Sequence, residues 1–267
     1  MKKNKIRVVI IGAAGRMGQE SVRAITAAED LELVGGIGHK ELDSIGADLG
    51  EIAGIKPLGI KLSDNLKDCI QRTKADVALD FTIPSAIFNN ANICLDCGVR
   101  PIIGATGLSN EDLKELEKKA NYLSSSILVA PNFTIGAVLM IEAAKKFAKY
   151  FDGVEIIELH HDKKVDAPSG TAIKTAKEIS KILEKKSKDL NPSAKARGDL
   201  VENIRIHSVR LPGILANQEV IFGGQGQSLS IKHDTLDRSA FMPGVLLAIR
   251  KIIDKKGLIY GLENLLD

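Results

Sequence analysis

Residues 158–171 hold the densest group of side chains that can exchange protons or bind an anion. His160 and His161 are adjacent, and Lys164 follows shortly after them. Adjacent residues of a strand point to opposite faces, so the two histidines are a poor chelating pair and we expect no metal site. These cationic donors predict instead a site that binds a small dianion and passes it a proton.

An anion-binding cradle is expected directly after these residues. Pro168 fixes a φ suited to a helix start and Ser169 can cap it, so a helix is predicted over 168–183. The N–H groups of Gly170 and Thr171 then point outward at the helix N-terminus, where a carboxylate or phosphate binds favourably. So many polar groups at one strand–helix junction favour a functional site over core packing.

A glycine-rich turn near the N-terminus is the second candidate site. Gly12, Gly15 and Gly18 follow a β-branched strand and open a helix. Small residues there let a pyrophosphate approach the backbone and the helix N-terminus. The spacing is G-x-x-G-x-x-G rather than G-x-G-x-x-G, and its position favours a dinucleotide site over a merely tight turn. Arg16 either reaches the cofactor or is a solvated first-turn residue.

The end of the second predicted strand bears on the choice of cofactor. NAD sites usually carry an acidic residue there, but this chain has Gly38, and the first acid is Glu41. His39 and Lys40 either face a 2′-phosphate or lie in a solvent-exposed loop. NADPH and NADH therefore both stay open as cofactors.

The elements that must position these residues fall into two groups, of which the first alternates strands with helices. This alternation predicts a doubly wound parallel sheet, whose ligands bind beyond the carboxyl ends of the strands. The predicted strands are 6–11, 31–37, 76–81, 101–104 and 127–129, and the predicted helices are 17–28, 63–71 (capped by Ser63), 84–97 and 109–123. Residues 80–82, 104–107 and 130–133 end such strands, and they either cradle a nicotinamide or form ordinary turns.

After Asn132 the alternation stops, which predicts a second, α+β domain with an open mixed sheet. Its predicted helices are 135–150 and 168–183, and its predicted strands are 154–160, 204–210, 219–223 and 228–233. The final stretch, 243–267, is predicted to be helical, and the basic stretch 185–197 to be a mobile surface loop. We expect a dinucleotide-binding domain of residues 1–132 plus 241–267, and a substrate-binding and oligomerisation domain of residues 133–240.

The composition excludes several classes of protein. The 267 residues are 44% hydrophobic and 27% charged, so a normal core can be buried. A net charge of +3 without a block of one sign, and only 4% aromatic residues, argue against a nucleic-acid partner. No apolar run approaches the ~18 residues of a membrane helix, and the apolar run after the basic start is too short for a signal peptide. We expect a cytoplasmic enzyme without a membrane partner.

The cysteines leave a redox pair or half a zinc site as alternatives, because Cys94 and Cys97 form a C-x-x-C. No second Cys/His pair stands at ligand spacing nearby, and the odd count of three cysteines disfavours a disulfide framework. Buried or half-buried free thiols in the last turn of a helix are the favoured interpretation.

Seven motifs, taken in order along the chain, resemble those of the 4-hydroxy-tetrahydrodipicolinate reductase family. These enzymes, also called dihydrodipicolinate reductases, act in lysine and diaminopimelate biosynthesis. The resemblance covers essentially the whole chain, and the H-H-x-x-K-x-D-x-P-S-G-T-A element is highly specific. The motifs are GAAGRMG at 12–18, DFT at 80–82, IIGATG at 102–107, APNFTIG at 130–136, ELHHDKKVDAPSGTA at 158–172, HSVRLPGILANQEVIFGG at 207–224 and IKHDTLDRSAFMPGVLLAIRK at 231–251.

The resemblance implies roles for individual residues. His160 matches the family's proton donor or acceptor, Lys164 its proton donor and His161 a substrate contact, while Gly170 and Thr171 match groups that hold a substrate carboxylate. The resemblance implies cofactor contacts at Gly12, Ala13, Ala14, Gly15, Arg16, Met17, Gly104, Ala105, Thr106, Ala130, Pro131, Asn132 and Phe133. We add Gly38 and His39, because they lie at the end of the second predicted strand.

The resemblance also implies a Rossmann-like domain completed by a C-terminal helix, NADPH and/or NADH as cofactor, a small dicarboxylate substrate and a homotetramer built through the open sheet. Two departures concern the cofactor: Gly38 replaces the acid of many members, and Ala105 replaces a threonine of the usual G-T-T-G.

Two rival functions are another Rossmann reductase, such as an aspartate- or homoserine-dehydrogenase-like enzyme, and a nucleotide-sensing regulator. The Ser-Gly-Thr cradle speaks against the first, and the lack of a visible basic helix-turn-helix segment against the second.

Overall fold

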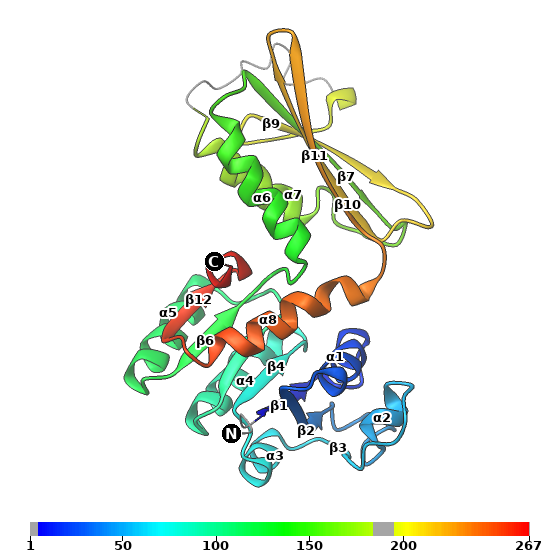
Figure 1. The fold of residues 1–267 in the computed structure, drawn as a ribbon, viewed down its shortest axis with the longest axis vertical. Coiled ribbons are helices and arrows are strands. Elements are labelled where there is room, and N and C mark those ends of the chain that lie inside the picture. The colour runs from blue at the N-terminus through cyan, green and yellow to red at the C-terminus, as the bar shows by residue number, and fades with distance from the viewer. Residues whose placement is uncertain (1–4, 184–194, 267) are drawn as a thin grey trace. The chain divides into compact units, whose positions relative to one another are not determined.

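The computed structural model describes residues 5–183 and 195–266. The chain divides into two compact units, a first unit of Met1–Phe133 with Phe241–Asp267 and a second unit of Thr134–Ala240. Each unit contains its own sheet and its own buried core (Figure 1). Within the described part of the chain, no helix is both long enough and apolar enough to cross a membrane.

The first unit is built on a parallel sheet, as the alternation of strands and helices predicted. Its seven strands lie in the order β12-β6-β5-β4-β1-β2-β3. They are β1 (Ile6–Ile11), β2 (Leu31–Ile37), β3 (Leu62–Ser63), β4 (Val77–Asp80), β5 (Arg100–Ile103), β6 (Ser126–Val129) and β12 (Gly257–Tyr260). The order changes direction at β1, which has β2 on one side and β4 on the other. This is the switch point at which open α/β sheets bind ligands.

Helices cover both faces of this sheet (Figure 1). Helix α1 packs against α8 on one face, while α4 packs against α3 and α5 on the other. The helices are α1 (Arg16–Ala27), α2 (Leu49–Ile52), α3 (Leu66–Thr73), α4 (Pro84–Asp96), α5 (Asn110–Tyr122) and α8 (Met242–Ile252). Strand β1 is buried from both sides, with Val8, Val9 and Ile10 each 0% exposed, which explains its unbroken run of apolar residues.

The C-terminal stretch corrects the expectation of a helix through 243–267. Helix α8 ends at Ile252, residues 253–256 form a turn, and Gly257, with a left-handed φ of +71°, begins the next element. The following residues form β12, which pairs in parallel with β6, and Leu262–Leu265 form a single 3-10 turn (η3). The apolar run 258–260 was therefore a short edge strand with too few residues to show a period.

Two smaller expectations were also wrong or incomplete. Ser63 does not cap a helix, because it ends β3, and the side chain of Asn65 caps α3 by accepting from the N–H of Asp68 at 3.1 Å. Of the predicted loop 185–197, residues 185–194 lie outside the described residues. Lys195–Arg197 form a 3-10 turn (η1).

The second unit has a mixed, open sheet of five strands in the order β11-β10-β7-β9-β8, which confirms the predicted class. The strands are β7 (Gly153–His160), β8 (Asp199–Val201), β9 (Ile204–Arg210), β10 (Ala216–Gly224) and β11 (Gln227–Thr235). Of the strands described in this unit, only β7 and β9 pair in parallel. Helices α6 (Ile135–Ala148) and α7 (Gly170–Ser180) lie side by side on one face (Figure 1) and bury a core that includes Ile156, Val220 and Phe222.

Candidate active site

Four loops of the first unit begin at one edge of the parallel sheet. Ile11 pairs with Asp80, Asp80 with Ile103, and Ile103 with Val129, so the last residues of β1, β4, β5 and β6 lie in one row. The residues that follow this row are 12–17, 81–82, 104–106 and 130–133. The structure thus brings together most of the cofactor contacts that the resemblance implied.

The turn after β1 needs its glycines for close packing. Gly12 has a φ of +83°, and a Cβ atom there would lie 3.2 Å from the carbonyl oxygen of Phe81. A Cβ atom at Gly18 would lie 2.2 Å from the carbonyl oxygen of Gly12, so this glycine lets α1 approach β1. Ala13 is 0% exposed, which leaves the backbone of the turn as the surface that a ligand can meet.

The N-terminus of α1 fits an anion such as a pyrophosphate. Its N-cap, Gly15, offers no side chain to the first N–H groups, and the first turn holds no acidic residue. The positive end of the helix dipole is therefore uncompensated within its own turn. Arg16 is exposed beside it, and Met17 is half-buried.

An aromatic pair shapes the edge beyond β4 and β5. The rings of Phe81 and Phe133 meet edge to face, with centroids 5.8 Å apart. A Cβ atom at Gly104 would lie 2.1 Å from the Phe81 ring and 3.0 Å from the Phe133 ring, so only glycine fits between them. Next to Gly104, Ala105 is half-buried and Thr106 is exposed, which leaves the threonine hydroxyl accessible to a ligand.

The turn after β4 is fixed by a buried carboxylate. Asp80 is 1% exposed and accepts hydrogen bonds from the Thr82 N–H at 2.8 Å, the Thr82 hydroxyl at 2.6 Å and the Asn90 amide at 2.9 Å. Burial raises the pKa of Asp80, although the bonds from Thr82 and Asn90 oppose that shift. Asp80 therefore holds this loop in place rather than facing solvent.

The end of β2 lies at the same edge, since Ile37 pairs with Ile11. The Gly38 N–H donates to the Ser63 carbonyl at 2.8 Å, and a Cβ atom at Gly38 would lie 3.0 Å from Leu62. The side chain of His39 is 67% exposed, with Nδ1 3.7 Å from the Glu41 carboxylate. Lys40 is also exposed. Both side chains are therefore accessible to a ligand, and His39 Nδ1 also accepts from the Glu41 N–H at 3.4 Å.

In the second unit, the strand β7, the loop 161–169 and the helix α7 form a second candidate ligand site. The Ser169 hydroxyl accepts from the Ala172 N–H at 3.2 Å and caps α7, as predicted. Gly170 is exposed, and a Cβ atom placed on it would meet nothing within 4 Å. The first turn of α7 holds no acidic residue. The first turn itself therefore adds no negative charge that would oppose an anion at Gly170 and Thr171.

Lys164 and His160 lie in this site but have different partners. The Lys164 Nζ atom lies 2.7 Å from both carboxylate oxygens of Asp166, and this hydrogen bond holds the pKa of Asp166 below its usual range. The Nδ1 atom of His160 contacts the carboxylate of Glu158. His161 is half-buried, and its carbonyl accepts from the Lys164 N–H at 3.1 Å.

Two residues of this site had no role in the sequence-based prediction. Glu158 is 0% exposed, and its carboxylate accepts a forked pair of bonds from Arg210 on β9, at 2.8 and 3.0 Å. A charged residue at an inward position of a strand, after Val154 and Ile156, was the signal that could have found Glu158. Arg210 follows in sequence only much later, and it is the pairing of β7 with β9 that brings it close.

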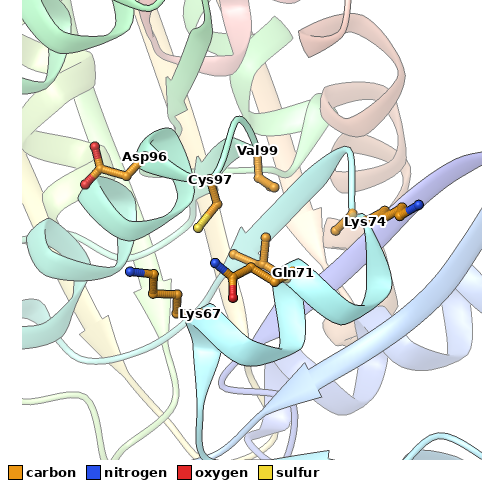
Figure 2. Close-up of a pocket in the computed structure, with 8 residues that line it drawn as sticks. Lys67, Gln71, Lys74, Asp96, Cys97 and Val99 are labelled. Carbon is orange, nitrogen blue, oxygen red and sulfur yellow. The ribbon is translucent and has the colours of Figure 1, made fainter.

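A hollow elsewhere in the first unit belongs to neither site. It has a volume of about 550 Å³ and lies between α3 and α4, where Lys67, Gln71 and Cys97 line it (Figure 2). Ala75 and Val99, which precede β4 and β5, also line it, so it lies at the amino-terminal edge of the sheet. Cofactors of such sheets bind at the opposite edge.

The cysteines are free thiols: Cys94 is buried on α4, and Cys97 is half-buried at its C-terminus, as the favoured interpretation predicted. Among the described residues, no group of three or more His, Cys, Asp or Glu side chains is arranged to hold a metal ion.

Comparison with known families now bears on both units. The family model described as "Dihydrodipicolinate reductase, N-terminus" matches residues 6–133, and the one described as "Dihydrodipicolinate reductase, C-terminus" matches residues 136–266. This chain belongs to the dihydrodipicolinate reductase family. The two matches together cover both candidate sites, which confirms the resemblance seen in the motifs.

Individual members of the dihydrodipicolinate reductase family match over their full length. A 4-hydroxy-tetrahydrodipicolinate reductase of Syntrophomonas wolfei is 48% identical, over 99% of this chain and 100% of the relative. One of Moorella thermoacetica is 47% identical, over 98% of each chain. The solved structure titled dipicolinate-bound dihydrodipicolinate reductase from Paenisporosarcina sp. TG-14 is 42% identical, with a TM-score of 0.87 over 98% of this chain and 100% of that one.

Proposed function

We propose that this chain catalyses the NAD(P)H-dependent reduction of 4-hydroxy-tetrahydrodipicolinate to tetrahydrodipicolinate, with loss of water, in lysine and diaminopimelate biosynthesis. The observation that carries the proposal is the full-length identity of 48% to a curated reductase of that name. The two candidate sites add chemical support, because one suits a dinucleotide and the other a small dicarboxylate. Residues 1–132 with 241–267 then form the dinucleotide-binding domain, and residues 133–240 the substrate-binding domain.

A nicotinamide dinucleotide fits the first unit. Residues 12–17 would hold its pyrophosphate at the uncapped N-terminus of α1. Gly104, Ala105, Thr106 and the turn 130–133 would border the nicotinamide at the aligned strand ends. When bound in reduced form, the nicotinamide supplies a hydride, which carries two electrons to a ring carbon of the substrate.

The second unit supplies charge and protons. Backbone N–H groups of Gly170 and Thr171 and the Thr171 hydroxyl would hold one substrate carboxylate, with His161 as a further contact. Once water has left and the ring has gained two electrons, negative charge spreads onto a neighbouring carbon and nitrogen. We choose Lys164 as the acid that protonates this site, because an ammonium group both stabilises negative charge electrostatically and can donate a proton. His160 assists or orients.

We infer that the enzyme uses NADPH at least as well as NADH. Gly38 places no carboxylate against the ribose, so the charge that would repel a 2′-phosphate is missing at that position. His39 and Lys40 are exposed cationic candidates for the phosphate, and Arg16 is exposed at the first turn of α1. Exposed ion pairs are typically worth ~0–1 kcal/mol, so the expected preference is modest, about 10-fold at most unless two cations converge on the phosphate.

We also propose a cytoplasmic homotetramer that assembles through the sheet of the second unit. Helices α6 and α7 cover one face only, and the other face carries the half-buried apolar side chains of Ile157, Leu159, Val209 and Ile221. Among the described strands, β11 and β8 form the two edges of this sheet, and sheet edges in proteins are usually covered. The free thiols of Cys69, Cys94 and Cys97 suit a reducing compartment.

A coupled assay tests the reaction. Aspartate semialdehyde, pyruvate and the preceding synthase generate the substrate in place, and oxidation of NADPH or NADH is followed with and without this enzyme. We expect oxidation only when the synthase and both its substrates are present. Oxidation with aspartate semialdehyde alone would support the rival dehydrogenase, and no oxidation under any condition would support a non-catalytic nucleotide sensor.

A further inference from the structure

The carboxylate of Glu158 in the second unit's ligand site is fully buried. The inward-facing residues of β7 are Val154, Ile156 and Glu158, and the first two belong to the apolar core against α6 and α7. Glu158 is 0% exposed. A buried charge costs free energy unless several partners satisfy it, so its contacts show what holds it there.

Contacts from His160, Ser169 and Arg210 reach both oxygens of this carboxylate. Oε1 accepts from the Arg210 Nη2 atom at 2.8 Å and from the Ser169 N–H at 3.3 Å. Oε2 accepts from the Arg210 Nη1 atom at 3.0 Å and contacts His160 Nδ1. Glu158 therefore joins the proposed proton-transfer histidine to the cap of the helix that would bind the substrate carboxylate.

These contacts fix which nitrogen of His160 carries hydrogen. Burial would raise the pKa of Glu158, but the bonds from His160, Arg210 and Ser208 outweigh it and lower that pKa to about 2. An ionised carboxylate can only accept, so Nδ1 must be the protonated nitrogen of the ring. Nε2 is then left for the substrate, and in the described part of the chain it has no hydrogen-bond partner. The side chain of His160 is 15% exposed.

Arg210 extends the network to the other proposed acid. Its Nη2 atom also donates to the carbonyl oxygen of Asp166 at 2.7 Å. The carboxylate of the same Asp166 holds the Lys164 ammonium at 2.7 Å. The guanidinium therefore ties the loop that carries Lys164 to the carboxylate that holds His160.

We propose that Glu158 is a positioning residue: it sets the tautomer and orientation of His160 and, through Arg210, the place of the Lys164 loop. This inference rests on the proposed function, in which His160 and Lys164 face the substrate. Neither Glu158 nor Arg210 touches the reacting atoms in this proposal.

The first test needs neither substrate nor cofactor. Ring nitrogens are observed by NMR in protein labelled with 15N-histidine, at about pH 8, above the ordinary histidine pKa of ~6.5. The chain has five histidines, and the His160→Gln variant identifies the His160 signals by their loss. We expect wild-type His160 to be protonated on Nδ1. Protonation mainly on Nε2 would overturn the inference.

Two variants test the assignment to Glu158. In Glu158→Gln, which is neutral and can donate as well as accept, we expect the preference for Nδ1 protonation to weaken. Glu155→Gln is the matched control, because Glu155 lies on the other face of β7 and contacts His207 Nε2 at 2.7 Å. It should move the His207 signals and leave those of His160 in place.

Kinetics separate positioning from simple stability. In folded Glu158→Gln, we expect kcat to fall about 10- to 100-fold, as misplaced catalytic groups do, while KM for the cofactor stays the same. Arg210→Lys keeps a cation beside Glu158 but cannot form the fork that also reaches Asp166, so kcat should be intermediate. If Glu158→Gln does not fold, the His160 spectrum of the wild type and the kcat of Arg210→Lys test whether Glu158 positions His160.

The outcomes distinguish this inference from the proposed function. Wild-type kcat in folded Glu158→Gln, with an unchanged His160 spectrum, overturns the positioning role and leaves the reductase assignment intact. A wild-type protein that shows the Nδ1 tautomer but does not reduce the dicarboxylate substrate retains the Glu158–His160 relationship and overturns the proposed function.

Discussion

The ammonium of Lys164 lies 2.7 Å from both carboxylate oxygens of Asp166, two residues along the same loop. The lysine side chain is 22% exposed and the aspartate side chain 61% exposed, so water reaches this pair mainly from the aspartate side. An incoming dianion can replace the aspartate as partner of the lysine, because both present carboxylates. The pair thus holds the Lys164 side chain in place before substrate binds.

Replacement of Lys164 by alanine should stop proton transfer and leave cofactor binding unchanged. We expect kcat to fall by about 10²-fold or more, the usual contribution of a general acid, with an unaltered Kd for NADPH. Steady-state kinetics and a cofactor titration measure the two quantities. The neighbouring Lys163, which is exposed, gives the matched control Lys163→Ala. Near-normal turnover in Lys164→Ala would remove this lysine from the mechanism.

Cofactor preference should respond to the residue at position 38. In the wild type, kcat/KM for NADPH should equal or exceed that for NADH. Gly38→Glu should shift the preference toward NADH, because a carboxylate binds the ribose hydroxyls and repels a 2′-phosphate. Gly38→Gln is the control of matched size, since the Leu62 side chain must yield slightly to either.

The side chain of Lys40 provides an independent check of the cofactor preference. Lys40→Ala should weaken NADPH selectively if that side chain reaches the 2′-phosphate. A strong preference of the wild type for NADH would show that neither His39 nor Lys40 reaches the adenosine ribose.

Gly104→Ala should damage the first unit locally. The new Cβ atom would lie 2.1 Å from the ring of Phe81, so the pair formed by Phe81 and Phe133 must move. Overpacking of this kind costs about 1–3 kcal/mol, and we expect a lower Tm and weaker cofactor binding. Gly153→Ala is the control, because a Cβ atom there would meet nothing within 4 Å. Equal Tm values for the two variants would contradict the packing argument.

The buried carboxylate of Glu158 makes stability depend on pH in acid. Its folded-state pKa of about 2 lies below its ordinary value of 4.5, so its contribution is fully present above pH 4.5. That contribution is lost as the pH falls from 4.5 toward 2, and a shift of this size corresponds to about 3 kcal/mol. Urea unfolding at several pH values should show this loss in the wild type and a smaller slope in Glu158→Gln.

A second acidic residue provides the control for that measurement. Asp237 is fully exposed, and the Ser239 hydroxyl and N–H lower its pKa. Because solvent screens its interactions, Asp237→Asn should change the slope far less. A Glu158→Gln slope that matches the wild-type slope would show that Glu158 contributes no such linkage.

Assembly through the open sheet predicts a particle of about four times the chain mass of 28.7 kDa. Light scattering at micromolar concentration measures it. Leu159→Asp places a charge on the open face of the sheet and should yield smaller species. Leu139→Asp, on the exposed side of α6, is the control and should leave the mass unchanged. A stable, active wild-type monomer would refute the tetramer.

The sequence predicted the elements whose patterns are local. The β-branched run of β1, the glycine turn after it and the Ser169 cap each follow from neighbouring residues, and the structure has all three. β12 was missed because four residues are too few to distinguish an edge strand from the continuation of a helix.

The buried part of the second site depends on the pairing of two strands that are far apart in the sequence. The fork between Glu158 and Arg210 joins residues 52 positions apart, and it exists because β7 and β9 pair in parallel. A charged residue in an apolar strand indicates that some partner exists, but only the sheet register identifies which one. Local motifs therefore indicated the histidines and the lysine, and missed the carboxylate and guanidinium behind them.

The place of α8 and β12 has a consequence for how the chain is made. Gly244 packs so closely that a Cβ atom would lie 1.9 Å from the carbonyl oxygen of Phe133, and β12 covers the free edge of β6. Both elements follow the whole second unit along the chain, so they leave the ribosome after it. The first unit must therefore wait, with one helix and one edge strand missing, until α8 and β12 emerge, whereas the second unit is one continuous segment and can fold earlier.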